Sequence, residues 1–269
     1  MKSNSQPIKL FLVVAFSCTT LLVSLTPVVA KPTLGFSISD RSNAKIPLAK
    51  TKIFNQPAIP PGPPPGGRVR GGAKRGDFPP TKHDLTALVP FTKESNSVIN
   101  VWGQTTLEHP SWFFYVPYTK DSRYAVEFVL QDQDSNEIYK KAIALPDKPG
   151  VIRVSLPTTA PGLPLNKQYR WFLTISSDRE KNSPPTFVEG VIQRVELNPA
   201  VVKELQTTEL LKRYAIYAQN GIWYEALTIL AQLRQKSPKD TELQAEWQNL
   251  LASIDLDDIA AEPIFLEEP

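Results

Sequence analysis

Side chains that could bind a metal are sparse in this sequence. The 269-residue chain contains two histidines, His83 and His109, and a single cysteine. A histidine-ligated site would need both imidazoles to converge with carboxylates, and the i, i+4 spacing that places two ligands on one helix face is absent. We therefore interpret both histidines as surface residues in loops and expect no metal centre.

One acidic segment partly matches a calcium-binding loop. Asp132, Asp134 and Asn136 occupy the first three ligand positions of such a loop. However, Glu137 stands where the sharp turn needs glycine, and Ile143 stands where the loop needs a bidentate glutamate. A polar hairpin turn is the better interpretation of this segment.

Catalytic motifs are also missing. The sequence has no Gly-x-Ser-x-Gly elbow, no phosphate-binding Gly-x-x-x-x-Gly-Lys and no dinucleotide fingerprint. Glu127 and Glu189 lie in predicted strands and are the one pair that could resemble glycosidase acids. Because outward glutamates are the normal polar half of a strand, we expect a protein that is not an enzyme and has no cofactor.

The tryptophans suggest a second kind of site. Trp102 stands beside Gly103 in a predicted loop, so we expect it to be exposed and consider it a possible contact for a sugar ring. The other four lie on apolar stripes and are predicted to pack in the core: Trp112, Trp171, Trp223 and Trp247.

The elements that would position these residues follow a segment typical of export. In residues 1–30, Lys2 and Lys9 precede an uncharged apolar stretch that ends at Val28-Val29-Ala30. This pattern predicts a cleaved signal peptide, with a retained membrane anchor as the alternative. Cys18 lies inside the signal, so the exported chain would have no disulfide. We expect a periplasmic or extracellular protein without a retained transmembrane helix.

Residues 31–80 are predicted to be a disordered basic linker. They contain ten prolines and seven glycines, and residues 31–84 carry ten Lys and Arg against three acids. A basic cluster lies here: Arg68, Arg70, Lys74 and Arg75. The cluster either contacts an acidic surface or glycan or belongs to a solvated spacer. No aromatic residues interleave with it, so we expect no nucleic acid as a partner.

Residues 81–197 carry equal numbers of acidic and basic residues, and their pattern predicts a β-sandwich. Short strands alternate with Pro and Gly turns, and Ser111–Val116 is apolar on both faces. Such a strand is expected to be covered by a sheet on one side and helices on the other. Leu163 and Tyr169, followed by Trp171, resemble the tyrosine corner of an immunoglobulin- or fibronectin-like sandwich.

Residues 198–262 are predicted to be an acidic helical tail packed on the sandwich, followed by an acidic terminus at 263–269. One helix should run from the cap Asn198 to about Gln219, and a second from about Ile222 to Lys236. A third should begin at a capping box formed by Thr241 and Gln244. The residues around Gly221 resemble one tetratricopeptide-like hairpin, without a second repeat.

Several sequence blocks together resemble a family of exported cyanobacterial proteins known as a domain of unknown function, DUF928. They include Phe113-Phe114-Tyr115-Val116-Pro117-Tyr118, Glu127-Phe128-Val129-Leu130-Gln131-Asp132 and Gly221-Ile222-Trp223-Tyr224-Glu225-Ala226-Leu227. The resemblance covers roughly residues 80–265 and implies an exported bacterial protein with a sandwich and a helical tail. It implies no activity, substrate or catalytic residue.

Together these features predict a non-enzymatic protein-interaction component of the bacterial cell envelope. The folded body would bind an envelope protein, and the basic segment would contact an acidic surface or glycan. The alternative hypothesis is a carbohydrate-binding module for envelope polysaccharide, with Trp102 as its contact residue.

Overall fold

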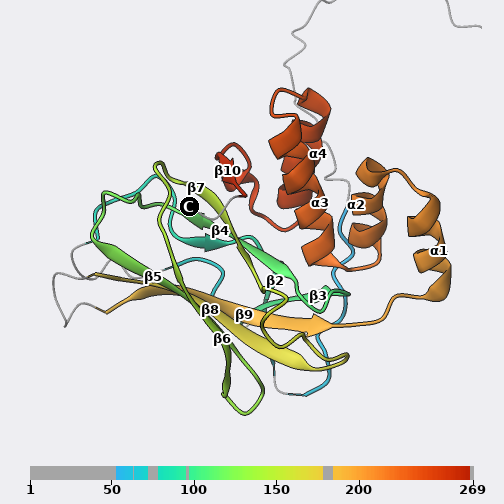
Figure 1. Ribbon diagram of the computed structural model, residues 1–269, viewed down its shortest axis with the longest axis horizontal. Coiled ribbons are helices and arrows are strands. Elements are labelled where there is room, and N and C mark those ends of the chain that lie inside the picture. The colour runs from blue at the N-terminus through green and yellow to red at the C-terminus, as the bar shows by residue number, and fades with distance from the viewer. Residues whose placement is uncertain (1–52, 63, 72–77, 95–96, 178–183, 267–269) are drawn as a thin grey trace, which may run out of the picture. The chain divides into compact units, whose positions relative to one another are not determined.

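The computed structural model describes residues 53–62, 64–71, 78–94, 97–177 and 184–266 (Figure 1). The predicted signal at residues 1–30, the first part of the predicted linker, and Lys74 and Arg75 lie outside the described residues. Within the described ranges, no helix is both long and apolar enough to cross a membrane.

Among the described residues, the fold is mainly β, with two sheets followed by helices as the sequence predicts, although there are four α-helices where the sequence predicts three. The first sheet has the order β2 (Phe91–Lys93), β3 (Ile99–Thr105), β9 (Thr186–Arg194), β8 (Gln168–Ser177), β5 (Tyr124–Gln131) and β6 (Glu137–Ile143). The second has the order β1 (Thr86–Ala87), β4 (Ser111–Val116), β7 (Gly150–Ser155) and β10 (Ile264–Phe265). Neighbouring strands are antiparallel except β3–β9 and β7–β10, which are parallel.

Aromatic side chains fill the space between the two sheets. From β4, Trp112 lies 4.9 Å from Phe128 of β5, and Phe114 lies 5.6 Å from Trp171 of β8, measured between ring centroids. All four side chains are fully buried. Because burial of large aromatic rings provides much of the stabilisation of a core, these contacts can hold the two sheets together without a disulfide.

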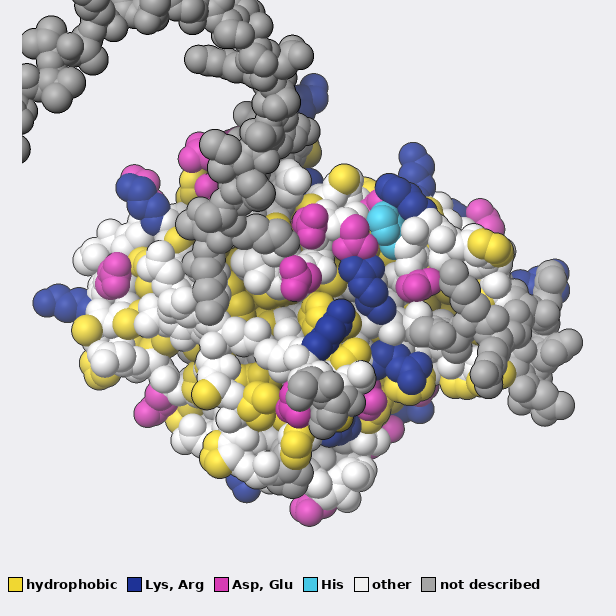
Figure 2. All heavy atoms as spheres, turned by 180° about the vertical axis from the view of Figure 1, so that it is seen from behind, with side chains coloured by type: hydrophobic (Ala, Val, Ile, Leu, Met, Phe, Trp, Pro, Cys, Tyr) yellow, Lys and Arg dark blue, Asp and Glu magenta, His cyan; other side chains and the backbone are white. Residues whose placement is uncertain are grey.

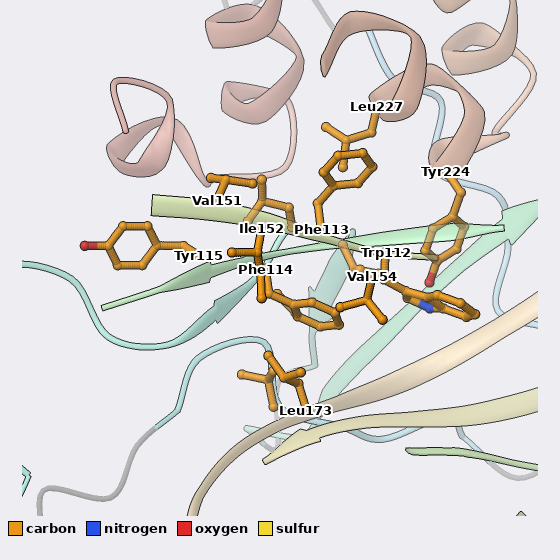
Figure 3. Packing of buried hydrophobic residues seen from close by; sticks show 14 of the residues in the cluster. Trp112, Phe113, Phe114, Tyr115, Val151, Ile152, Val154, Leu173, Tyr224 and Leu227 are labelled. Atoms are coloured by element: carbon orange, nitrogen blue, oxygen red, sulfur yellow. The ribbon is translucent and has the colours of Figure 1, made fainter. Parts of the chain in front are cut away.

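The other face of β4 is covered by helix α3 (Trp223–Lys236). Figure 3 shows Phe113 pointing toward Leu227 of this helix, away from Phe114. The Trp223 indole N–H donates a 2.8 Å hydrogen bond to the Leu88 carbonyl, which anchors the start of the helix beside β1. The predicted double cover of Ser111–Val116 is therefore confirmed, and it explains why this strand is apolar on both faces.

The single helix predicted for residues 198–219 is two helices, α1 (Pro199–Thr207) and α2 (Leu210–Gln219). The break occurs at Thr208, whose backbone is extended. The hydroxyl groups of Thr207 and Thr208 both donate to the Glu204 carbonyl, so side chains compete for a backbone acceptor at the end of α1. Asn198 caps α1 as predicted, because its side chain accepts from the Ala200 N–H.

Helix α4 (Thr241–Ala252) is capped one residue earlier than the sequence suggests. The Asp240 carboxylate accepts hydrogen bonds from the N–H groups of Glu242 and Leu243, so Thr241 is the first helical residue. The Gln244 side chain donates to the Pro238 carbonyl instead of closing the predicted capping box with Thr241. An acidic cap also interacts favourably with the positive end of the helix dipole.

The described part of the predicted linker packs on the folded body instead of forming a free chain. Arg68 exchanges backbone hydrogen bonds of 2.9 and 3.0 Å with Glu189 of β9. At the next residue, the Val69 carbonyl accepts from the Ala87 N–H of β1. Residues 66–71 therefore connect β9, an inner strand of the six-stranded sheet, to β1, an edge strand of the four-stranded sheet, and we call them the seam segment.

The composition of the predicted linker suggests disorder, but in its described part the apolar residues and one glycine make specific contacts with the fold. Val69 of the seam segment and Phe54, which precedes that segment in the predicted linker, are both buried, and Phe54 lies 5.0 Å from Trp223, measured between ring centroids. Gly67 has a φ of 121°, and a Cβ there would lie 2.7 Å from the Glu189 carbonyl oxygen. Glycine is thus required for close approach to β9.

Candidate functional site: a groove beside α1 and α2

A groove of about 710 Å³ lies between the end of the sandwich and helices α1 and α2. The β9–α1 connection forms one wall, and the turn after β3 contributes Thr106. Its apolar lining comes from Leu165, Val195, Leu197, Pro199, Val202, Leu205 and Tyr217, and its charged and polar lining from Thr106, Arg194, Glu196, Gln206 and Arg213.

Exposed hydrophobic side chains gather at this groove. Six large hydrophobic residues within the described ranges are exposed, and Leu165 and Val202, at 38% and 41%, line the groove. Two more lie near lining residues in the chain: Leu107 follows Thr106, and Leu210 precedes Arg213 by about one turn of α2. Because single exposed apolar residues are common whereas clustered ones mark interaction surfaces, this concentration identifies the groove as the candidate site.

Loose packing of α1 produces the hollow. Leu205 is the one buried residue of α1, so most of the helix surface contacts solvent. The break at Thr208 ends α1, and the Arg213 Nε donates a 2.7 Å hydrogen bond to the Thr208 carbonyl, which fixes the turn between the helices. Val202 therefore faces the groove rather than a packed neighbour.

The two arginines of the groove have different surroundings. Arg194 donates to the carbonyl oxygens of Thr106 and Leu163 and forms a 3.0 Å ion pair with Glu108. This arginine shapes the groove floor, and its charge is neutralised. For Arg213, no carboxylate among the described residues lies within ion-pair distance.

A buried acid lies directly behind the groove floor. Glu225, in the first turn of α3, is 5% exposed, and its Oε1 accepts hydrogen bonds from the Thr106 N–H and hydroxyl at 2.5 and 2.6 Å. The Thr105 hydroxyl also donates to Oε1, whereas the buried Oε2 has no hydrogen-bond partner among the described atoms. Burial raises the pKa of the Glu225 carboxyl, and the Thr106 hydrogen bonds partly oppose this shift.

The structure places two of the four predicted basic residues, Arg68 and Arg70, in internal contacts. The Arg68 guanidinium lies 4.4 Å from the centre of the Phe187 ring. Arg70 forms a bidentate pair with Asp258 at 2.7 and 2.8 Å. These two members of the predicted cluster hold the seam segment on the fold, and they lie outside the groove lining.

The prediction that Trp102 is exposed in a loop is wrong. Trp102 is 1% exposed and belongs to β3, where it pairs with Val191 of β9. The adjacent Gly103 is part of the same strand, and a Cβ there would lie 3.1 Å from the Tyr224 ring. The glycine permits close helix–sheet packing, so it does not mark a turn.

His83 belongs to an ionic cluster that joins the N-terminal part of the described chain to its C-terminal end. Its Nδ1 lies 3.5 Å from Asp258, and its Nε2 lies 3.3 Å from Glu262 without hydrogen-bond geometry. Lys82 pairs with Glu262 at 2.7 Å, and the Arg70 guanidinium holds the pKa of Asp258 below its usual value. We call these five residues the clasp. His83 is therefore largely covered, in contrast to the surface position predicted for it.

Acidic and basic side chains lie interspersed on the face shown in Figure 2, with a histidine among them. Across the described ranges, no group of three or more His, Cys, Asp or Glu is arranged to hold a metal ion. Glu127 pairs with Lys140 at 2.9 Å, and Glu189 lies 3.6 Å from Arg170, so each glutamate has a different cationic neighbour. The Asp132 carboxylate accepts from the N–H groups of Asp134 and Asn136, as expected for a polar turn.

The comparisons with known proteins show the family. The family described as Domain of Unknown Function (DUF928) matches residues 70–264. The chain belongs to this family. The matched range begins within the seam segment and includes the whole groove lining, the clasp and both sheets. None of the curated proteins matches the chain.

Some solved structures have a remote likeness to this DUF928 protein. A family 76 glycoside hydrolase from a bovine Bacteroides thetaiotaomicron strain is 13% identical with a TM-score of 0.23, covering 41% of this chain and 21% of that one. Parabacteroides merdae beta-glucuronidase is 11% identical with a TM-score of 0.23, covering 65% of this chain and 34% of that one. This chain thus matches about a third or less of each of those chains, and such low scores carry no argument about function.

Sequence reasoning did not find the groove. The available signals were Leu107 and Leu165, which are apolar residues within turns, and Val202, which lies on a helix whose one buried residue is Leu205. Their significance depends on the break at Thr208, because one continuous helix would have no gap between α1 and α2.

Proposed function

We propose that this protein is a non-enzymatic interaction component of the bacterial cell envelope that binds a partner protein in the α1–α2 groove. The observation that carries the proposal is the exposure of apolar side chains at one hollow: Leu165 and Val202 line it, and Leu107 and Leu210 lie near lining residues in the chain. Removal of such surface from water by a partner is favourable, at about 25 cal/mol per Å² of apolar area.

The setting of the proposal comes from the sequence. The signal-like residues 1–30 support export to the periplasm or cell exterior, and the resemblance of the sequence blocks supports a cyanobacterial source. Arg68 and Arg70 are engaged within the fold, so contact with an acidic surface or glycan would fall to Lys74 and Arg75.

We further propose that the sandwich is immunoglobulin-like. The grouping of β1, β4 and β7 in one sheet and β5, β8 and β9 in the other parallels the division of strands A, B and E from C, F and G. Tyr169 lies near the start of β8, two residues before Trp171, where such a sandwich has its tyrosine corner. The antiparallel pair α2 and α3, joined through Gly221, supports the proposal of one tetratricopeptide-like hairpin.

The carbohydrate-binding hypothesis loses its motivation. It depends on an exposed tryptophan at position 102, and the 1% exposure of Trp102 leaves no ring face on which a sugar could stack. Among the groove's lining residues the one aromatic side chain is Tyr217, and it is partly buried.

Site-directed photocrosslinking in the native envelope tests the proposal. A benzoylphenylalanine replacing Val202 should give a reproducible adduct with one envelope protein, because Val202 lines the groove. The same group replacing Val98, which is similarly exposed at 38% but lies outside the groove lining, serves as the matched control. Repeated absence of an adduct specific to position 202 would overturn the proposal.

A further inference from the structure

We infer that the occupant of the groove is a partner segment with aliphatic side chains next to one carboxylate, and that Arg213 binds this carboxylate. The inference rests on the proposed function, because it specifies the chemistry of a ligand for the same groove. Its two parts, the aliphatic preference and the carboxylate, follow from different groups of lining residues.

The aliphatic preference comes from the shape and lining of the groove. Five branched aliphatic side chains line the hollow, from the β9–α1 connection, α1 and the turn before β8: Leu165, Val195, Leu197, Val202 and Leu205. A volume of about 710 Å³ accommodates several side chains rather than one. The shallow, open form of such a site suits a segment laid along α1 and α2.

The carboxylate preference comes from Arg213. Its Nε is held by the Thr208 carbonyl at 2.7 Å, which fixes the plane of the guanidinium at the groove wall. The Nη groups have no carboxylate partner among the described residues, whereas the charge of Arg194 is matched by Glu108. An oriented guanidinium with an uncompensated charge favours a planar bidentate acceptor, which a carboxylate supplies.

One further charge limits the occupant. Glu196 also lines the groove and is exposed. A second carboxylate in the bound segment would be repelled by Glu196, so the ligand is expected to carry one acid near its aliphatic residues rather than an acidic run. On α2, Leu210, Arg213 and Tyr217 follow one another at helical spacing, so apolar and cationic contacts alternate along one face of that helix.

The test uses a random peptide library displayed on phage and panned against the purified protein. We expect selected peptides to share two or more aliphatic residues within a few positions of a single Asp, Glu or C-terminal carboxylate. Arg213→Glu should raise the dissociation constant of the selected peptides by at least about tenfold, since it removes a charge-assisted contact and adds repulsion.

Matched variants identify the surface that binds. Lys212→Glu makes the same charge change on the neighbouring position of α2, where the side chain is 74% exposed, and should change affinity less than about twofold. Val202→Asp should abolish binding, whereas Val98→Asp should not. Circular dichroism of each variant confirms that the fold is retained.

The possible failures are distinguishable. If peptides lose affinity with Val202→Asp but not with Arg213→Glu, the groove binds apolar segments and the carboxylate inference is wrong. If selection yields no peptides, or peptides that neither substitution affects, the inference about the occupant is overturned as a whole. The photocrosslinking experiment at position 202 then decides separately whether an envelope protein occupies the groove.

Discussion

The interior around β4 and the groove around α1 are both built from apolar side chains, but they differ in what covers them. In β4, Trp112 and Phe114 pack against the six-stranded sheet, and Phe113 packs beneath α3. In α1, Leu205 is buried, whereas Val202 remains 41% exposed beside the hollow. A stretch of apolar residues thus indicates a core only where a second element is available to cover it.

Glu225 lies between these two regions. It is at the start of the helix that covers β4, and its carboxylate binds Thr106 on the groove floor. The groove floor is therefore attached to the core through a buried polar group, while its outer walls carry few such attachments. This arrangement predicts that substitutions have graded effects from the core toward the groove wall.

The largest effect is expected from Trp171→Ala. Trp171 is fully buried between the sheets, and a Cβ on Gly190 would lie 2.5 Å from its ring, so the residue fills its space closely. Removal of the ring should lower the free energy of unfolding by about 3–5 kcal/mol. Urea denaturation measures this change, and a loss below about 1 kcal/mol would contradict the assignment of Trp171 to the shared core.

A smaller loss is expected from Glu225→Leu. The leucine leaves the N–H and hydroxyl of Thr106 without their buried acceptor, so the free energy of unfolding should fall by about 1–3 kcal/mol. Glu225→Gln keeps an oxygen that can accept both bonds and serves as the matched control. If the two variants are equally stable at neutral pH, the Thr106 hydrogen bonds do not hold the groove floor.

The pH dependence of stability gives a second test at the same residue. Burial raises the pKa of Glu225, so the folded protein binds this proton more tightly than the unfolded chain does. The contribution of Glu225 to stability is therefore greatest at acidic pH and declines as pH rises from its usual pKa through the raised one. Glu225→Gln should remove this part of the decline in unfolding free energy with rising pH, as measured by denaturation curves at several pH values. If the pH dependence is the same in the variant and the wild type, the pKa of Glu225 is not raised.

A weaker contribution is expected from the clasp. Arg70 and Asp258 are partly exposed, so Asp258→Asn should lower stability by less than about 1 kcal/mol, with a smaller difference in high salt. The pKa of Asp258 is lowered mainly by the hydrogen bond from Arg70. Its contribution is therefore present at neutral pH and is lost as pH falls from the usual carboxyl pKa through the lowered one. A double-mutant cycle with Arg70→Gln isolates the pair, and a coupling indistinguishable from zero would rule the pair out as a stabilising contact.

The smallest effect on stability is expected at the groove wall. Val202→Ser should change the free energy of unfolding by no more than about 0.5 kcal/mol, because the side chain is already exposed to water. Thermal unfolding of the Val202→Ser and Trp171→Ala variants, measured under the same conditions, provides the comparison. A loss above about 1.5 kcal/mol would show that Val202 belongs to the core, and the contrast between the two regions would then fail.

The sequence predicts the sandwich well because its strands obey local rules. Ser111–Val116 matches the bounds of β4, and its two apolar faces predict both covering layers. The break at Thr208 was not predicted, because it depends on hydroxyl groups that compete for one backbone carbonyl. The glycines of the seam segment suggest a flexible chain when read alone, since the need for close approach arises only when β9 is in place.

The candidate site could not be predicted for a related reason. A groove is defined by the absence of a neighbour, and a sequence pattern of one chain does not show which apolar residue lacks a covering element. Trp102 illustrates the reverse error, because its neighbour Gly103 resembles a turn residue, whereas in the fold it allows Tyr224 to approach the sheet. Predictions of exposure made from single residues were thus less accurate than those made from strand periodicity.

The hydrogen bonds of the seam segment have a consequence for the behaviour of shortened forms of the protein. By pairing with Glu189, on the part of β9 that lies beyond its pairing with β3, and with Ala87 of the edge strand β1, residues 66–71 occupy backbone groups that would otherwise be open to another polypeptide. A fragment beginning at residue 81, where sequence composition places the domain boundary, would expose these backbone groups of β9 and β1 and the pocket left by Val69. Such a fragment should self-associate through β-strand pairing, so the seam segment protects the protein against aggregation.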